Sequence, residues 1–239
     1  MNDPIVLVTG AGGALGGAVA RRAAKDGMRV VLADLERGRA RLEALATELG
    51  AGRALVATFD LGDAAAWTAA LGRVKEAFGA LPTRAVLVAG AWQGGAPVHE
   101  AKDESVWRAM LAANADTAYR ALRALLPGMV AAKDGSVVVI GSRAVQQPWT
   151  SANAAEYGAS KAAVVALTQA IAQEVLEHGV RVNAILPSTM DTPANRAAMP
   201  AADPARWVST DSAAAVIAFL LSSDSRDVSG AAIPVYGRA

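Results

Sequence analysis

A doubly wound, three-layer α/β sandwich around a mostly parallel sheet of about seven strands is the fold class that the sequence predicts. Two features predict it. Short, valine-rich apolar runs alternate with alanine-rich helical stretches, and the apolar runs are continuous, as in strands buried on both faces. The chain has 239 residues, 53% of them hydrophobic, which is enough for one large domain with a sizeable core. We therefore expect residues 1–239 to form a single domain.

The expected strands are short and mostly apolar. They are Ile5–Thr9, Arg29–Ala33, Ala54–Phe59, Ala85–Ala89, Val137–Ile140, Val180–Leu186 and Ala231–Val235. Alanine-rich segments of high helix propensity separate them. The expected helices are Ala18–Asp26, Arg37–Leu49, Ala64–Phe78, Ser105–Leu126, Glu156–His178 and Thr210–Leu221. This alternation is typical of a parallel sheet with helices on both faces.

One segment interrupts the alternation of strands and helices. The stretch from Pro187 to Val208 holds Pro193, Pro200 and Pro204 as well and is too long for a simple turn. Long loops in compact domains are often lids or binding loops. We therefore expect a substrate loop at about 187–209.

Charge and composition argue against several classes of partner and site. The net charge is +1 without a basic tract, so binding to nucleic acid or to a membrane surface has no electrostatic support. The chain has no cysteine, which excludes disulfides and thiolate chemistry. No stretch approaches the roughly 20 apolar residues of a membrane span, and no signal peptide is evident, so we expect a cytoplasmic protein. His99 and His178 lack partners at metal-ligand spacing, so we expect surface histidines and no metal site.

A glycine-rich turn follows the first expected strand. The turn and the helix start after it contain Gly10, Gly12, Gly13, Ala14, Leu15 and Gly16. Glycine permits a tight turn and lets the backbone approach a pyrophosphate, to which the helix N-terminus offers free N–H groups. The alternative is a tight turn that binds no ligand.

Asp34, at the end of the second expected strand, favours the ligand. A carboxylate at this distance from the turn can accept hydrogen bonds from the adenosine ribose and would repel a 2′-phosphate. The alternative for Asp34 is a helix N-cap. Turn, strand and acid together predict a dinucleotide site, with Leu35 beside Asp34, that holds NAD rather than NADP.

Tyr157 and Lys161 lie four residues apart in an expected helix and therefore share one face. Tyrosine titrates near pH ~10, and a nearby ammonium lowers that pKa, so the pair suits proton exchange with an alcohol or carbonyl oxygen. Alone, the pair would more often be an ordinary surface pair.

Two further polar residues strengthen the catalytic interpretation. Ser142 follows the buried run Val137–Gly141, at the strand end where α/β sheets bind ligands. Asn114 lies in a largely apolar helix, where a polar residue needs a reason. The alternative for Asn114 is an amide that faces solvent or bonds to the helix backbone. Ser151 is a second candidate for the catalytic serine.

In order and spacing, these motifs resemble those of the short-chain dehydrogenase/reductase family, over essentially the whole chain. The resemblance rests on Thr9–Gly16, Asp34, Asn114, Ser142, the run Tyr157-Gly158-Ala159-Ser160-Lys161, and the strand Val180–Pro187. It implies a Rossmann-type sandwich and an oxidoreductase that interconverts a carbonyl and an alcohol with NAD(H).

The resemblance also implies roles. Tyr157 would be the general acid/base, Lys161 would bind the nicotinamide ribose and depress the tyrosine pKa, Ser142 would hold the substrate oxygen, and Asn114 would support Lys161 through a water. Further cofactor contacts would come from Asp60, Leu61, Ala89, Gly90, Pro187, Thr189 and Thr192.

The chain departs from the family pattern at several places. Ala14 replaces the middle glycine of the turn, so Gly12 and Gly13 are expected to supply its flexibility. Leu87-Val88-Ala89-Gly90 replaces Asn-Asn-Ala-Gly, which removes polar support behind the site. Ser188 stands where a glycine usually follows the proline. Residues 88–92 also resemble, locally and weakly, the dihydropteridine reductase branch.

The substrate and the assembly are less defined. Trp92, Trp149 and Met190 are candidate substrate contacts, with loop anchoring as the alternative. The apolar helices Ser105–Leu126 and Glu156–His178 suggest a homotetramer or homodimer. Alternative functions are a 3-oxoacyl-carrier-protein reductase that uses NADPH and a nicotinamide-cofactor sensor without turnover.

Overall fold

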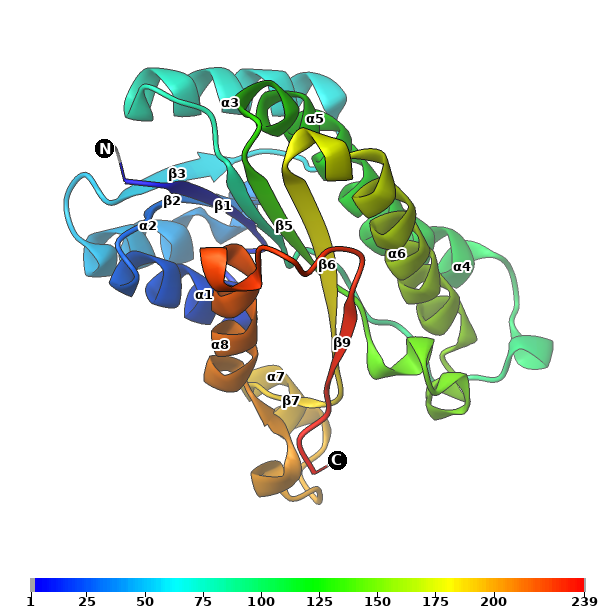
Figure 1. Ribbon diagram of the computed structural model, residues 1–239. Helices are drawn as coiled ribbons and strands as arrows, with labels where there is room; N and C mark the ends of the chain where they lie inside the picture. The colour runs from blue at the N-terminus through cyan, green and yellow to red at the C-terminus, as the bar shows by residue number, and fades with distance from the viewer. Residues whose placement is uncertain (1–2, 239) are drawn as a thin grey trace.

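A parallel sheet of seven strands forms the centre of the computed structural model, which describes residues 3–238. The strand order is β3-β2-β1-β4-β5-β6-β9 (Figure 1). The strands are β1 (Ile5–Thr9), β2 (Arg29–Asp34), β3 (Ala54–Thr58), β4 (Arg84–Leu87), β5 (Gly135–Ile140), β6 (Val180–Pro187) and β9 (Ala232–Val235). The predicted doubly wound fold is confirmed.

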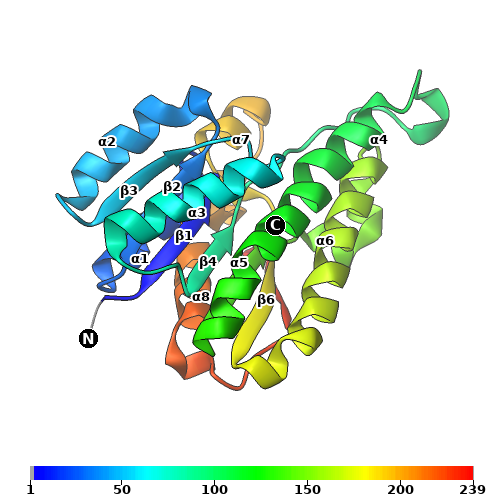
Figure 2. The same cartoon turned by 90° about the horizontal axis from the view of Figure 1, so that it is seen from above.

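Helices cover both faces of the sheet (Figure 2). One face carries α1 (Ala14–Lys25), α2 (Arg39–Leu49) and α8 (Thr210–Leu221), and the other carries α3 (Ala64–Phe78), α5 (Thr117–Ala132) and α6 (Ala155–Glu174). The strands are buried on both faces because each face packs against its own helical layer, which explains their continuous apolar sequences. Within residues 3–238 no helix combines the length and apolarity needed to cross a membrane.

The helix predicted at Ser105–Leu126 is interrupted. It is α4 (Ser105–Met110), a π-helical turn (Leu111–Asp116) and α5, which continues past Pro127 to Ala132. The π-helical turn contains Asn114, whose side chain bonds to a neighbouring loop. Such turns are frequent at functional sites.

The first helix begins at Ala14, so the predicted start at Ala18 was wrong. Two glycines of low helix propensity, Gly16 and Gly17, lie in its first turns. Packing requires glycine at position 16, because a Cβ on Gly16 would lie 2.2 Å from the carbonyl oxygen of Gly10.

The strand order reverses between β1 and β4, and this places the site. The chain runs outward from β1 to β2 and β3, then returns to β4 on the other side of β1. In such sheets ligands bind beyond the carboxyl ends of the strands at the reversal.

The segment between β6 and α8 projects from this carboxyl edge (Figure 1). It contains β7 (Met190–Asp191), α7 (Pro193–Ala198) and β8 (Val208–Ser209), and the two short strands pair at its base. The end of the chain fastens this base, because the backbone N–H of Arg238 donates to the carbonyl of Arg206 over 3.0 Å.

Candidate active site

The glycine-rich turn joins β1 to α1 with a backbone only glycine adopts readily. Gly10 has a φ of +65°, and a Cβ on it would lie 3.0 Å from the backbone nitrogen of Ala89. Gly13 precedes α1 with φ −85° and provides no side-chain cap. The left-handed conformation is therefore at Gly10 rather than at Gly12 or Gly13.

Asp34 closes this turn from the end of β2. Its Oδ2 accepts a 3.0 Å hydrogen bond from the backbone N–H of Gly12, and its Oδ1 accepts one of 2.8 Å from Leu35. Asp34 is half-buried and caps no helix, since Gly38 precedes α2 and gives no side-chain hydrogen bond. The glycine turn, the start of α1 without a side-chain cap and the carboxylate fit a dinucleotide.

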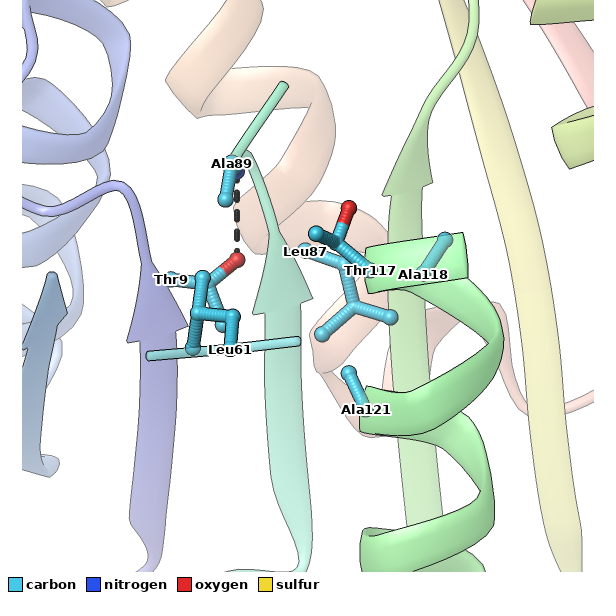
Figure 3. Close-up of a pocket in the computed structure, with 7 residues that line it drawn as sticks. All are labelled: Thr9, Leu61, Leu87, Ala89, Thr117, Ala118 and Ala121. Atoms are coloured by element: carbon cyan, nitrogen blue, oxygen red, sulfur yellow. Dashed lines mark hydrogen bonds between the residues drawn. The ribbon is translucent and has the colours of Figure 1, made fainter. Parts of the chain in front are cut away.

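The backbone after β4 is held by Thr9, whose hydroxyl accepts a 3.1 Å hydrogen bond from the N–H of Ala89 (Figure 3). Leu87 is 4% exposed and belongs to the hydrophobic core. In Figure 3 these residues and Ala121 line a narrow crevice. The packing of Leu87 and the hydrogen bond from Ala89 to Thr9 therefore hold the backbone after β4, where the family pattern has two asparagines.

Asn114 is buried and fully paired. Its Oδ1 accepts from the N–H of Ala91 over 3.0 Å, and its Nδ2 donates to the carbonyl of Ala91 and to the hydroxyl of Ser160, each over 3.0 Å. The solvent-facing or helix-bound alternative for Asn114 is therefore wrong. Ser160, which sequence reasoning missed as a functional residue, donates in turn to the carbonyl of Tyr157. A buried polar residue directly before Lys161 was the signal for it.

Ser142, two residues after the end of β5, lies together with Tyr157, which is in the first turn of α6. Burial raises the pKa of Tyr157 above its ordinary value, and a hydrogen bond with the Ser142 hydroxyl opposes that rise. Ser151 is directed elsewhere, since its hydroxyl donates to the carbonyl of Pro148 and lies against Gly158. The structure thus places Ser142, rather than Ser151, beside the tyrosine.

Lys161 is buried one helical turn after Tyr157. Its Nζ donates to the carbonyl of Ile140 over 2.8 Å, and burial lowers the pKa of Lys161 to about 8. A Cβ on Gly90 would lie 3.3 Å from this Nζ and 2.5 Å from Oδ1 of Asn114. The absence of a side chain at position 90 therefore lets Asn114 and Lys161 approach the backbone closely.

The other expected cofactor contacts lie along the same edge. Asp60 is exposed and accepts from the N–H of Gly62, and Leu61 is buried below it. Pro187 ends β6, and the carbonyl of Thr189 accepts from Val208. The hydroxyl of Thr192 caps α7 by accepting from Asn195 over 3.2 Å.

The two tryptophans that the sequence suggests as substrate contacts lie at the surface of the protein. Trp92 is 66% exposed and Trp149 is 71% exposed, so neither anchors its loop against the core. Their loops are tied to each other, because the N–H of Gly95 donates to the carbonyl of Asn153 over 2.7 Å. Met190 is half-buried against the core beneath α8, as loop anchoring predicts.

In the described part of the chain, no three histidine or carboxylate side chains gather where they could hold a metal ion. The imidazole of His99 is 81% exposed, as expected of a surface histidine.

Comparison with known proteins agrees with this geometry. The family model described as short chain dehydrogenase matches residues 4–203. The chain is 35% identical over 191 residues to 2,5-dichloro-2,5-cyclohexadiene-1,4-diol dehydrogenase of Sphingobium indicum, covering 79% of this chain and 74% of that protein. It is 32% identical over 253 residues to meso-2,3-butanediol dehydrogenase of Serratia marcescens, covering 100% and 95%.

Among solved structures, it is similar to a 3-oxoacyl-[acyl-carrier protein] reductase with bound NAD from Brucella melitensis. The TM-score is 0.85 at 29% identity, over 99% of this chain and 90% of that one. The family match, these relatives and the site at the carboxyl edge lead to one conclusion: this chain belongs to the short-chain dehydrogenase family and is an oxidoreductase that acts on hydroxyl groups with a nicotinamide cofactor.

Proposed function

We propose that this protein is an NAD-dependent dehydrogenase that interconverts a small secondary alcohol, namely one hydroxyl of a diol, with the corresponding ketone. The observation that carries the proposal is the placement of Ser142 beside Tyr157, with Lys161 buried one helical turn away and its ammonium on the carbonyl of Ile140. A protein that only sensed the cofactor would have no use for this proton-transfer set.

Each of the three side chains has a distinct task. Tyr157 gives its phenolic proton to the substrate oxygen in reduction and takes it back in oxidation. Ser142 donates a hydrogen bond to that oxygen and so stabilises the charge that develops on it. The nicotinamide ring, when bound, supplies or accepts the hydride.

Lys161 supplies positive charge beside the phenol. With a pKa of about 8 it is mostly protonated at neutral pH. An ammonium near a phenol favours the phenolate, and we propose that Lys161 opposes in this way the rise that burial causes in the pKa of Tyr157. We propose that the same ammonium leaves the carbonyl of Ile140 to bind the nicotinamide ribose.

NAD is the proposed cofactor because of Asp34. Its carboxylate is held at the glycine turn by Gly12 and Leu35, in reach of the adenosine ribose hydroxyls. The same charge disfavours a 2′-phosphate. The remaining cofactor contacts proposed from the sequence lie along this carboxyl edge.

The proposed substrate class rests on the names of the relatives and on two exposed tryptophans. Both curated relatives described above are named as dehydrogenases of diols. Trp92 and Trp149 would add apolar surface around a small ring or chain. A panel of cyclic and acyclic diols and single alcohols, assayed with NAD and NADP by nicotinamide absorbance, tests this. Turnover of none of them with either cofactor would refute the proposal.

A 3-oxoacyl-carrier-protein reductase remains the second candidate, because a solved protein of that name is similar over 99% of this chain. That protein holds NAD. Reduction of an acetoacetyl thioester with NADH or NADPH, faster than any diol oxidation, would favour the second candidate.

We also propose a homo-oligomer, either a dimer or a tetramer. Trp107 of α4 and Tyr119 of α5 are 44% and 50% exposed, and large exposed aromatic side chains often mark subunit interfaces. Light scattering of the purified protein, with Tyr119→Glu as the disrupting variant, tests the assembly.

A further inference from the structure

The loop after β4, residues 88–97, packs against the start of α6 at a position where only glycine fits. A Cβ on Gly94 would lie 2.5 Å from the Cβ of Ala154 and 2.9 Å from the carbonyl oxygen of Asn153. Ala154 is 5% exposed and directly precedes α6. The two segments therefore touch here because position 94 has no side chain.

A hydrogen bond and two unusual backbone conformations lie at the same contact. The N–H of Gly95 donates to the carbonyl of Asn153 over 2.7 Å. Gly95 has a φ of +124°, which residues with a side chain rarely adopt. Asn153 has a φ of +64°, and asparagine tolerates this left-handed conformation better than most residues. Backbone of this kind persists where the surrounding structure holds it, and it is frequent at functional sites.

The same loop is attached to α6 at a second place. The backbone N–H and carbonyl of Ala91 bond to the side chain of Asn114, which in turn donates to the hydroxyl of Ser160. Ala154 lies three residues before Tyr157, and Ser160 lies three residues after it. The loop is therefore attached to the helix on both sides of Tyr157, about one helical turn away in each direction.

Both exposed tryptophans belong to segments that take part in this packing. Trp92 lies in the loop after β4, between its two attachments. Trp149 lies in a 3₁₀ turn that ends at Ser151, and a Cβ on Gly158 would lie 2.5 Å from the hydroxyl of that serine. Close packing on the first turns of α6 thus fixes both segments relative to Tyr157.

We propose that Gly94 is a positioning residue, whose contact with Ala154 fixes the loop that carries Trp92. The place of this loop relative to Tyr157 then sets how tightly a bulky apolar alcohol binds. The proposal rests on the proposed dehydrogenase function and deepens it, because it assigns the choice among alcohols to the packing of this loop. The attachment through Asn114 remains when residue 94 is enlarged, so α6 stays in place while the outer part of the loop moves.

A pair of reciprocal substitutions tests the contact. Gly94→Ala adds a methyl group too close to that of Ala154, and Ala154→Gly removes the second methyl group. We expect Gly94→Ala to raise KM for a cyclohexanediol about tenfold, as the cost of overpacking a tight contact predicts. KM for butanediol and for NAD, and kcat for both diols, should change by less than about twofold. In the double variant, KM for the cyclohexanediol should return to within about threefold of the wild type.

Asn153 offers a second way to disturb the contact, with a conservative control. Asn153→Ala disfavours the left-handed conformation, whereas Asn153→Gly keeps it accessible. We expect the alanine variant to raise KM for the cyclohexanediol as Gly94→Ala does, and the glycine variant to behave like the wild type. Gly72→Ala, on α3, is the control for a new methyl group, because a Cβ there would meet nothing within 4 Å.

Exchange of the Gly95 N–H with deuterium, followed by nuclear magnetic resonance, reports on the contact without turnover. The hydrogen bond to Asn153 should slow this exchange in the wild type. We expect Gly94→Ala to accelerate it about tenfold or more, and Ala154→Gly in the same protein to slow it again.

Other outcomes overturn the proposal in distinguishable ways. Faster exchange at Gly95 with unchanged kinetics of Gly94→Ala shows that the contact is structural alone. A fall in kcat for both diols shows a general disturbance of α6, and a KM that the double variant does not restore shows that Ala154 is not the partner that matters. A wild type that oxidises no alcohol refutes the proposed function, and the role of Gly94 with it.

Discussion

Asn114 donates a 3.0 Å hydrogen bond from its side-chain amide to the hydroxyl of Ser160, and this contact joins the loop after β4 to the catalytic helix. The other bonds of Asn114 go to the backbone of Ala91, and Ser160 donates onward to the carbonyl of Tyr157. The chain of bonds therefore fixes where α6 presents Tyr157 relative to the loop that lines the proposed cofactor site.

Ser160→Ala removes this link without removing a proposed catalytic group. We expect kcat to fall about tenfold or more with little change in KM, because misplacement by a fraction of an ångström is costly for proton transfer. Thr168→Val is the matched control, since Thr168 is an equally buried hydroxyl on α6 that bonds only to the carbonyl of Val164 among the residues described. Equal loss of kcat in both variants would show a general effect on α6 and contradict the positioning role.

Tyr157→Phe deletes the proposed proton donor and little else. We expect turnover to fall about 10²–10⁴-fold, with cofactor affinity and melting temperature close to those of the wild type. Because burial raises the pKa of Tyr157, the phenol is protonated at neutral pH in the free enzyme, so alcohol oxidation in the wild type should rise with pH. Near-native turnover of the variant, with chemistry rate-limiting, would show that another group moves the proton.

The parts of the fold and site that could be predicted share a physical cause. Strands buried on both faces have continuous apolar sequences, and Tyr157 and Lys161 keep a fixed spacing on one helix, so both are visible in the sequence. Asp34 was visible for the same reason, as an acid at a strand end.

Contacts between distant segments were not visible. The bond of Asn114 to Ser160 spans 46 positions, and the approach of Arg41 to Gly12 depends on how α2 packs. The interruption of the predicted helix at Leu111–Asp116 follows from the bonds of Asn114 to Ala91, which helix propensity does not encode. Helix propensity likewise misplaced the start of α1, because the packing of Gly16 against Gly10 outweighs its low propensity.

Substitutions of Trp92 and Trp149 test whether these side chains contact the substrate. If they flank the substrate, replacement of either by alanine should raise KM for bulky apolar alcohols more than for small ones. Both are mostly exposed, so we expect little change in melting temperature. Phe219→Ala, on α8 and 44% exposed, is the control for loss of an exposed aromatic side chain. A lower melting temperature without any dependence on substrate size would indicate a purely structural role.

Substitutions of Asp34 test the proposed preference for NAD over NADP. Two like charges about 4 Å apart repel by about 1 kcal/mol in water and by about 4 at an effective dielectric near 20. We therefore expect kcat/KM of the wild type to be at least about tenfold higher with NAD than with NADP. Asp34→Ser should narrow or reverse the ratio. Asp34→Asn, which keeps an acceptor for Gly12, separates the charge from the support of the turn. A wild type that favours NADP would contradict the role of Asp34.

Lys161, for which we propose a role in catalysis, is expected to lower the stability of the fold, because its ammonium is buried. Burial lowers the pKa of Lys161 to about 8, from an ordinary value of 10.5 in the unfolded chain. Below pH 8 the lysine is charged in both states, and the folded state bears the full cost of burying the charge. Between about 8 and 10.5 the unfolded state binds more protons, so wild-type stability rises with pH over that window.

Lys161→Met should therefore abolish activity and yet stabilise the fold at neutral pH. A pKa shift of this size corresponds to roughly 3 kcal/mol at about 1.4 kcal/mol per unit, and loss of the hydrogen bond to the carbonyl of Ile140 offsets about 1. We expect a net gain of about 1–2 kcal/mol at pH 7 that shrinks as the pH rises from 8 towards 10, because only the wild type releases a proton on folding there. Denaturant unfolding of both proteins at pH 7, 8.5 and 9.5 measures the difference. A gain that is constant or grows with pH would mean that the stability of the wild type does not respond to the charge on Lys161.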